Sequence, residues 1–252
     1  MIPPSLITRL ETFVRRPLLT AAVLSSAVVL LAGCSGSGDG SNDAATGTNA
    51  GASQPSATPA AAAKLKSGTD LKPLLPTIKD MPKGFTVVKD QVRDTGGDIG
   101  PADKLTPVST PNCADLDGNS WSLSLGGSSA FAQTGFASKD GSNISIEIDS
   151  YEGNVAQKIM TGYKKIFTGC KTYKTKGDGQ TGTEKVVLKP GLDVGDASLH
   201  AVATSTMFQG GITYAAVKVG PQVVTVTWSS QSKDLGAKGV DLATTIATQL
   251  QS

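Results

Sequence analysis

The feature that most restricts what this chain can fold into is a short, mostly apolar run that ends at a cysteine. Residues 18–32 form this run; Arg9, Arg15 and Arg16 precede it, and Gly33 and Cys34 follow it. A basic start, an apolar centre and a small-residue site are the three parts of a signal peptide. The run has about fifteen residues, whereas a helix needs about twenty to cross the hydrocarbon core of a membrane. The pattern therefore favours an exported chain over one with a permanent transmembrane helix.

The residues at the end of this run resemble a lipobox, the cleavage and lipidation signal of bacterial lipoproteins: Leu31-Ala32-Gly33-Cys34. We therefore predict cleavage before Cys34 and lipidation of its thiol, which would hold the mature protein on the outer face of the cytoplasmic membrane. Each methylene buried in the membrane contributes about 0.8 kcal/mol, so two or three acyl chains would be a sufficient anchor. An ordinary secretory signal and an uncleaved anchor are the alternatives. The pair Arg15-Arg16 also resembles a twin-arginine signal, so the export route stays open between that system and general secretion.

The rest of the chain divides into a tether and one domain. From residue 34 to residue 65 the sequence is rich in Ser, Gly, Ala and Thr and has no apolar periodicity, which is typical of a flexible tether. Residues 66–252 are enough for a single domain with its own core. The predicted organisation is a signal peptide at 1–33, a tether at 34–65 and one extracellular domain at 66–252.

The charge balance argues against nucleic acid as a partner. Without residues 1–33, the 23 basic and 21 acidic side chains become 20 and 20. Arg93 is the only arginine among them, whereas nucleic-acid surfaces cluster basic charge and use the guanidinium fork. Aromatic residues make up 5% of the chain, so a carbohydrate-stacking platform is also disfavoured.

Two further cysteines remain, Cys113 and Cys170. Outside the membrane an even pair is normally oxidised, so we expect a disulfide between them. Closing a loop of this length would remove unfolded-state entropy equivalent to about 4 kcal/mol. A redox pair or metal site would need a CxxC spacing or partner histidines, and the sequence supplies neither.

Periodicity indicates a series of strands and two long helices. Ile144, Ile146 and Ile148 alternate with Ser145, Glu147 and Asp149, which predicts a strand with one buried face and one face in water. The expected strands are Gly84 to Val92, Ser128 to Ala137, Ile144 to Ser150, Glu184 to Leu188, Ala197 to Phe208, Ile212 to Val219 and Val223 to Ser229.

The expected helices are a short one at Asp70 to Leu75, a brief turn near Cys113, and long ones at Glu152 to Gly169 and Lys233 to Leu250. The first long helix carries an apolar stripe of Val155, Ile159, Tyr163 and Ile166 or Phe167, and the second carries one of Leu235, Leu242, Ile246 and Leu250. Together these elements predict an α+β fold: a mainly antiparallel twisted sheet with two long helices packed on one of its faces, and one disulfide.

No group of residues points to catalysis or to a metal. His200 is the only histidine, lies in a predicted strand and is expected to be structural. Residues 177–182 match Gly-x-Gly-x-x-Gly but follow a helix and precede a strand, the reverse of a phosphate-binding loop, so a plain loop is predicted. Asp115 and Asp117 are expected to serve a turn, since the EF-hand spacing is missing. Four large aromatic residues are expected in the core: Trp121, Trp228, Tyr151 and Tyr214.

The order of elements resembles a known extracellular module. The features are Cys113, Ser129-Ala130-Phe131, the helix Val155 to Phe167, Cys170 and Gly195-Asp196 before a strand. They resemble the sensor domain of the PknH type, found outside a mycobacterial kinase and in many actinobacterial lipoproteins. The resemblance implies a central antiparallel sheet flanked by helices and a cleft for an unidentified ligand. A second disulfide of the kinase sensor has no counterpart here.

These observations lead to a functional expectation with two alternatives. We expect a lipid-anchored binding or sensing module whose cleft takes a small ligand, and which is neither an enzyme nor dependent on a cofactor or metal. The alternatives are a structural lipoprotein that binds another envelope protein, and a lipid carrier with a deep apolar cavity. A carboxylate pair in a cleft, or His200 with an acidic partner, would favour an enzyme.

Overall fold

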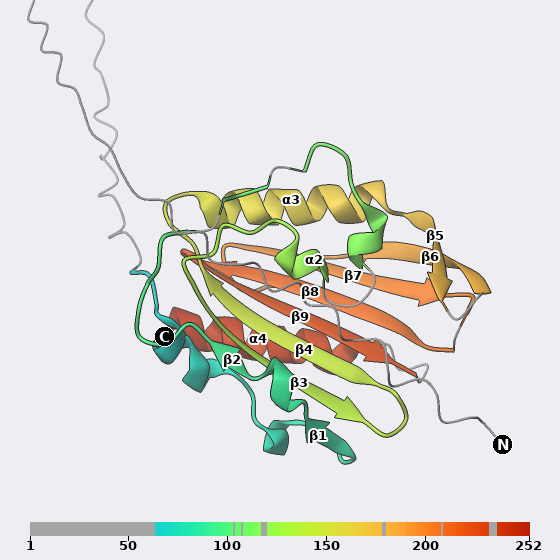
Figure 1. Cartoon of the computed structure of the whole chain (residues 1–252), viewed down its shortest axis with the longest axis horizontal. Coiled ribbons are helices and arrows are strands. Elements are labelled where there is room, and N and C mark those ends of the chain that lie inside the picture. Colours follow the sequence, from blue (N-terminus) through green and yellow to red (C-terminus); the bar gives the residue numbers. More distant parts are fainter. Residues whose placement is uncertain are drawn as a thin grey trace, which may run out of the picture. The chain divides into compact units, whose positions relative to one another are not determined.

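A computed structural model describes residues 64–252 except 103, 107, 117–119, 178–179, 208 and 232–235. The predicted signal peptide, Cys34 and nearly all of the predicted tether lie outside the described residues. The described strands form one antiparallel sheet in the order β1-β3-β4-β9-β8-β7-β6-β5, and β2 also pairs with β3 (Figure 1). The strands are β1 Phe85–Val87, β2 Arg93–Asp94, β3 Ala130–Ser138, β4 Asn143–Ser150, β5 Thr172–Gly177, β6 Gln180–Lys189, β7 Ala197–Ser205, β8 Gly211–Val219 and β9 Gln222–Ser230.

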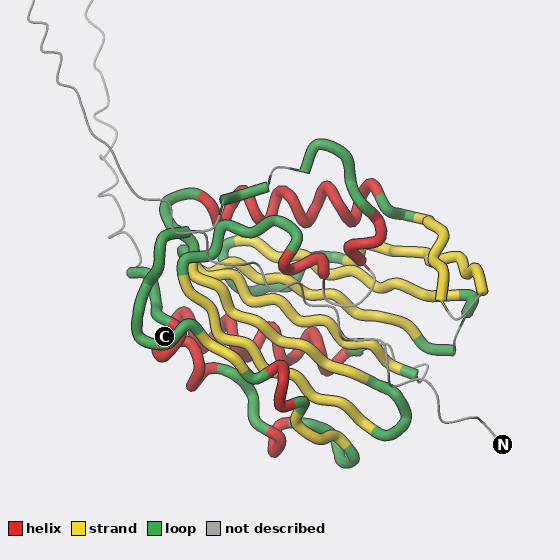
Figure 2. The backbone as a smooth tube through the Cα atoms, in the orientation of Figure 1, coloured by secondary structure: helices red, strands yellow, loops and turns green. Residues whose placement is uncertain are grey.

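Figure 2 shows the helical elements in red and the strands in yellow. The α-helices are α1 Gly68–Leu71, α2 Ser120–Leu123, α3 Val155–Gly169 and α4 Ala237–Gln251. Short 3₁₀ turns are η1 Lys72–Leu74, η2 Ile78–Asp80, η3 Lys89–Gln91 and η4 Cys113–Leu116. No helix in the described part of the chain is both long enough and apolar enough to cross a membrane.

Tight turns and the long connection through α3 produce the order of strands β3 to β9. Strands β8 and β9 are joined at Gly220 and Pro221, and Gly220 has a φ of 56°, a left-handed conformation that favours glycine. Helix α3 carries the chain from β4 to β5 at the far edge of the sheet, and β5 to β9 then return strand by strand. Strand β9 finally pairs with β4, for example Val226 with Ile146. This pairing places the last strand in the middle of the sheet.

The sheet is covered on both faces, which corrects the expectation that the helices share one face. On β8, Tyr214 and Ala216 belong to the core under α3, whereas Ala215 and Val217 belong to the core under α4. Since successive side chains of a strand point to opposite faces, the two helices lie on opposite sides of the sheet. A strand that is apolar on both faces needs a cover on each, and Figure 1 shows α3 above the sheet and α4 below it.

The polar face of β4 is also buried, against the prediction that it faces water. Ser145, Glu147 and Asp149 are buried, with relative exposures of 7%, 6% and 3%. They are covered by the described residues of the range 95–128, which leave out 103, 107 and 117–119 and include η4 and α2; these are here called the covering segment. The buried Trp121 of this segment donates a hydrogen bond from its Nε1 to Thr227 Oγ1 on the neighbouring strand β9, at 2.8 Å. The covering segment has no apolar periodicity, so its position on the sheet could not be read from the sequence.

Other expectations are confirmed, and two need correction. The α+β class, the antiparallel sheet and the Cys113–Cys170 disulfide are confirmed, with an S–S distance of 2.07 Å. The predicted strand Gly84 to Val92 is instead β1 followed by the 3₁₀ turn η3, and β2 begins only at Arg93. Strand β5 was not predicted, because its residues Thr172–Gly177 alternate β-branched and aromatic residues with lysines and lack a clear apolar face.

Candidate functional site

A hollow between α3 and the covering segment is the candidate ligand site. Its volume is about 470 Å³, within the range of small-ligand pockets. One wall is helix α3, and the other is the covering segment. We call this hollow the α3 groove; its lining residues are Leu105, Thr106, Val108, Leu125, Asn154, Gln157, Lys158, Thr161, Gly162 and Lys165.

The apolar wall of the α3 groove comes from Leu105, Val108 and Leu125. The backbone N–H of Thr106 donates to the carbonyl oxygen of Leu125 at 2.8 Å, which holds the two ends of this wall together. Gly162 lets the wall lie directly on the helix, because a Cβ there would sit 2.6 Å from Leu125 Cδ1. The groove therefore depends on a glycine in the middle of α3, where a larger residue would have to move the wall.

Helix α3 contributes two lysine side chains to the groove. Lys158 and Lys165 are exposed and seven residues apart, which is close to two helical turns and places them on the same side of α3. Helix α3 contains no acidic residue. Within the described residues the ion pairs are Lys72–Asp94 and Lys218–Asp196, so neither lysine of the groove has a described acidic partner.

A second hollow of about 400 Å³ lies beside the first, and the two share Asn154 and Gln157. Leu65, Tyr151 and Pro221 form its apolar part. Its cation, Lys218, is already paired with Asp196 at 2.8 Å. This hollow therefore offers less unpaired charge than the α3 groove.

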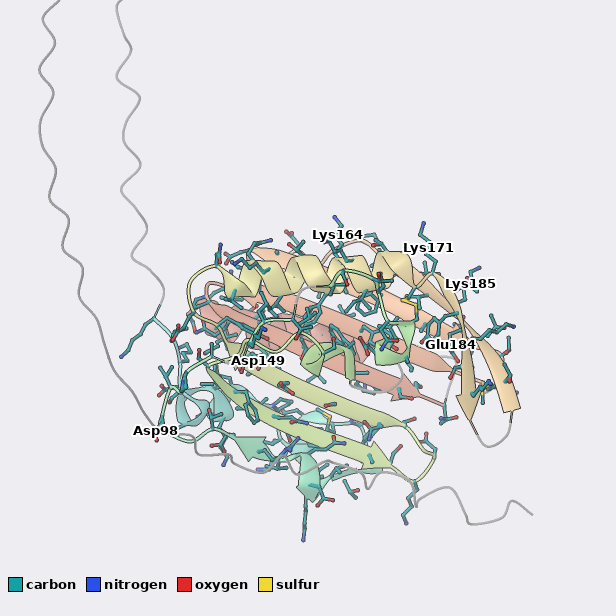
Figure 3. All side chains as sticks on the ribbon, turned by 45° about the horizontal axis from the view of Figure 1, so that its top comes forward. Asp98, Asp149, Lys164, Lys171, Glu184 and Lys185 are labelled. Carbon is teal, nitrogen blue, oxygen red and sulfur yellow. A yellow bond between two sulfur atoms is a disulfide. The ribbon has the colours of Figure 1, made fainter. Side chains whose placement is uncertain are left out.

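The covering segment and α3 also enclose a pair of carboxyl groups. Glu147 and Asp149 lie two residues apart on the same face of β4 and have relative exposures of 6% and 3%. Their side chains are hydrogen-bonded to one another. Asp149 Oδ2 has no hydrogen-bond partner among the described residues. Figure 3 shows Asp149 between the sheet and the layer above it.

Burial determines the protonation of this pair. Burial raises the pKa of Glu147 to about 7, against the opposing effects of the hydrogen bond with Asp149 and the positive charge of Arg93. Burial, and then the negative charge of Glu147, raise the pKa of Asp149 well above its usual range. Both carboxyl groups therefore keep their protons to higher pH than exposed carboxyl groups do.

Two buried tyrosines border the carboxyl pair. Burial, followed by the charge of Asp149, raises the pKa of both Tyr151 and Tyr163 well above the usual value. The Tyr163 hydroxyl donates to the Ser122 carbonyl oxygen at 3.0 Å, which ties α3 to α2. Tyr151 also lines the second hollow, so it lies between that hollow and the carboxyl pair.

The other residues that the sequence singled out do not assemble into a site. His200 lies on β7, where its cross-strand partners are Lys189 and Ala215; burial and then Lys189 lower its pKa. Asp115 accepts a hydrogen bond from Asn112 at 2.8 Å, as expected for a turn, and Asp117 lies outside the described residues. The described residues contain no group of three or more His, Cys, Asp or Glu placed to hold a metal ion.

The remaining predicted positions are structural. The four aromatic residues Trp121, Trp228, Tyr151 and Tyr214 are all buried. Gly177 pairs with Gln180, so the described part of the glycine-rich stretch belongs to strands β5 and β6 and not to the predicted loop; residues 178–179 lie outside the described residues. Sequence reasoning missed the α3 groove and the buried carboxyl pair. An available signal was the absence of acidic residues near Lys158 and Lys165.

Comparisons with known proteins support the fold. No protein-family model and no curated protein matches the chain. Among solved structures, it is similar to the extracellular domain of PknH from Mycobacterium tuberculosis, with 12% identity and a TM-score of 0.53, covering 75% of this chain and 98% of that one. It also matches the Rv0999 ortholog from Mycobacterium smegmatis, with 16% identity and a TM-score of 0.37, covering 69% and 93% of the two chains. The described part of the chain thus has a fold of the PknH extracellular-domain type.

Proposed function

We propose that this protein is a lipid-anchored, extracytoplasmic module that binds a small ligand in the α3 groove and acts in sensing. The observation that carries the proposal is the groove itself, where an apolar wall faces two lysines without described acidic partners. A few polar groups converging on an apolar hollow are typical of small-ligand sites. The fold shared with a kinase's extracellular domain is consistent with a sensing role.

The anchor and the location follow from the sequence. Lipid on Cys34 would hold the protein on the outer face of the cytoplasmic membrane, and residues 34–65 would let the domain stand away from it. The disulfide is consistent with an oxidising compartment outside the membrane. The membrane is then a partner through the lipid alone, and nucleic acid is not a partner.

We propose no catalytic activity and no cofactor. The side chains of Glu147 and Asp149 are of the type that serves as general acid and general base in some enzymes. Neither of them, however, is among the residues that line the two hollows, and both are almost completely buried. A general acid or base has to come within hydrogen-bond reach of the group it serves. The pair is accordingly assigned to the interior of the fold.

A second candidate function is binding to another envelope protein. At the β5–β6 edge of the sheet, β6 exposes Val187 on one face and Leu188 on the other, with relative exposures of 40% and 38%. Exposed apolar residues beside an open sheet edge favour contact with another protein. This surface is remote in sequence from the α3 groove, so the two functions can be tested separately.

The experiment is a thermal-shift screen of residues 35–252 with the disulfide intact, against envelope metabolites, glycan fragments, lipids and divalent ions. A ligand present at a hundred times its dissociation constant adds about 2.7 kcal/mol of stability, so a true ligand gives a saturable shift. Replacing the exposed Thr161 by tryptophan fills the groove and should abolish the shift. A ligand that still stabilises the Thr161→Trp variant would have to bind outside the α3 groove. No shift with any compound of the panel would favour the protein-partner function.

A further inference from the structure

The chemistry of the α3 groove restricts the class of ligand that it can hold. Leu105, Val108 and Leu125 offer apolar surface, and a ligand without an apolar part would leave that surface in water. Lys158 and Lys165 offer positive charge, which complements a negatively charged group. An uncharged ligand would gain no charge–charge attraction from the two ammonium groups at the groove.

No acidic residue is among the described residues that line the α3 groove. Helix α3 carries Lys158, Lys164 and Lys165 and no acidic residue. Elsewhere in the described chain, Lys72 is paired with Asp94 and Lys218 with Asp196, at 2.9 and 2.8 Å. Lys158 and Lys165 belong to neither of these ion pairs, so a bound anion would be their partner.

The distance between the lysines fits one head group. Seven residues of α-helix place their Cα atoms about 10 Å apart along the axis, and each side chain is long enough to reach toward the middle. The volume of about 470 Å³ lies in the lower half of the range for small-ligand pockets, which suits one slender chain better than a bulky lipid.

We propose that the α3 groove binds a monoacyl amphiphile with an anionic head group. The acyl chain lies on Leu105, Val108 and Leu125, and the head group lies within reach of Lys158 and Lys165. This inference rests on the proposed function, and adds to it the chemical class of the ligand. A carboxylate and a phosphate head group share the required chemistry, so both belong to the proposed class.

The test is isothermal titration calorimetry of residues 35–252 with laurate and with dodecyl phosphate, each below its aggregation concentration. Dodecanol serves as the uncharged chain and butyrate as the anion without a long chain. We expect saturable binding of one laurate or one dodecyl phosphate, and binding of dodecanol and butyrate weaker by at least about tenfold. Tighter binding of one head group identifies the source as a fatty acid or as a phosphate ester.

The lysines are tested by substitution with a matched control. The double variant Lys158→Gln, Lys165→Gln should weaken laurate binding by about tenfold, since each exposed ion pair contributes only modestly. The control is Lys164→Gln, because Lys164 is exposed on the same helix, does not line the groove and projects away from the sheet (Figure 3); it should bind laurate normally. Thr161→Trp, which retains both lysines, should block binding by filling the groove.

The outcomes separate the ligand class from the proposed function. Equal binding of laurate and dodecanol, or unchanged laurate binding in the double lysine variant, would overturn the anionic class. Absence of laurate and dodecyl phosphate binding would also overturn it. If the thermal-shift screen then found another ligand sensitive to Thr161→Trp, the proposed function would still stand.

Discussion

Among single residues, Glu147 and Asp149 are the least expected feature of the molecule. Two carboxyl groups are buried side by side, and their hydrogen bond to one another requires that one of them be protonated. The titratable or charged groups around them are Arg93 on β2, Tyr151 after β4 and Tyr163 on α3. The residues that face Glu147 on the neighbouring strands, Gln133 and Thr225, are uncharged. Arg93 also donates a hydrogen bond to Gln133 at 3.1 Å, so the single arginine of the domain lies beside the pair.

The raised pKa values predict a stability that falls as pH rises. Above the usual pKa of 4.5 the unfolded chain releases the Glu147 proton, whereas the folded protein retains it up to a pKa of about 7. The folded state therefore binds more protons in this window, so the free energy of unfolding decreases with pH; the raised pKa of Asp149 adds to the decrease above its usual value of 3.8. We expect Glu147→Gln to flatten the decrease between pH 4.5 and about 7, by up to about 1.4 kcal/mol per pH unit. Urea denaturation at a series of pH values measures this.

Two other sets of groups determine how this experiment is interpreted. The lowered pKa values of Asp70, Asp80, Asp94, Asp140 and Asp196 affect stability only near and below their usual value of 3.8. The lowered pKa of His200 acts in the opposite sense, since its neutral form is favoured and stability rises as pH approaches 6.5. The comparison is therefore between the wild type and Glu147→Gln. Identical pH profiles for the two would refute the assignment.

At the level of elements, the fold is stabilised at the points where irregular segments meet regular ones. The disulfide joins η4 to the residue that follows α3, with a Cα–Cα distance of 5.5 Å. Tyr163 and Tyr214 donate hydrogen bonds to carbonyl oxygens of the covering segment, on Ser122 and Leu116. The covering segment is thus attached to the sheet and to α3 at several points, although it has little secondary structure of its own.

Loss of the disulfide should weaken the domain considerably. It closes a loop with a sequence separation of 57, so the double variant Cys113→Ser, Cys170→Ser should lose about 4 kcal/mol of unfolding free energy. Chemical denaturation of the variant and of the reduced wild type measures the loss. Reducing agent should leave the variant unchanged. A loss of less than about 1 kcal/mol would mean that the bond contributes little to the closure of the covering segment.

Helix α1 should depend on a glycine for its contact with the sheet. A Cβ on Gly68 would lie 2.6 Å from the backbone nitrogen of Thr95 and 2.8 Å from the carbonyl oxygen of Phe131. Backbone atoms cannot move aside easily, so Gly68→Ala should destabilise the protein by about 1–3 kcal/mol. Gly97→Ala is the matched control, because a Cβ there meets no atom within 4 Å, and its effect should stay within about 0.5 kcal/mol. Thermal unfolding of both variants measures the difference. Equal stability of Gly68→Ala and Gly97→Ala would disprove the close contact at Gly68.

In the whole molecule, a sheet with two covered faces is combined with a predicted lipid anchor. The core under α4 is aliphatic apart from Phe136 and Trp228, whereas the core under α3 contains the Trp121, Tyr163, Phe167 and Tyr214 rings in edge-to-face contact. The α3 side also holds the groove and the buried carboxyl pair. The two faces of the sheet therefore differ in role, with α4 completing the core and α3 forming the candidate site.

Anchoring by Cys34 gives a prediction about the whole chain. Cells fed an alkyne-tagged fatty acid should label the full-length protein and retain it in the membrane fraction. Cys34→Ala should lose the label and either keep its signal peptide or be released. Cys34→Ala protein that still carries lipid would contradict lipidation at this residue. The binding properties of the domain should be the same in either case, because the groove lies in residues 105–165.

The local elements were predictable because their signals are local. The alternation at 144–150 indicated β4, the helical stripe indicated α3, and two cysteines in a chain with a predicted export signal indicated the disulfide. The strand and the helix are determined by residues close together in the sequence. The disulfide could be predicted because each of the two cysteines had one available partner. The strand β5 escaped prediction because edge strands need no continuous apolar face, and its lysines resemble a loop.

The sequence by itself determined the antiparallel elements, the apolar stripe of α3 and the disulfide partners. Only the tertiary structure decided that α4 lies opposite α3, that Glu147 and Asp149 are buried and that Lys158 and Lys165 border a groove. An alternating strand has the same pattern whether its polar face meets water or a covering segment. That choice depends on where residues 95–128 lie, and a segment without periodicity gives no sign of its position until the rest of the fold provides the surface on which it packs.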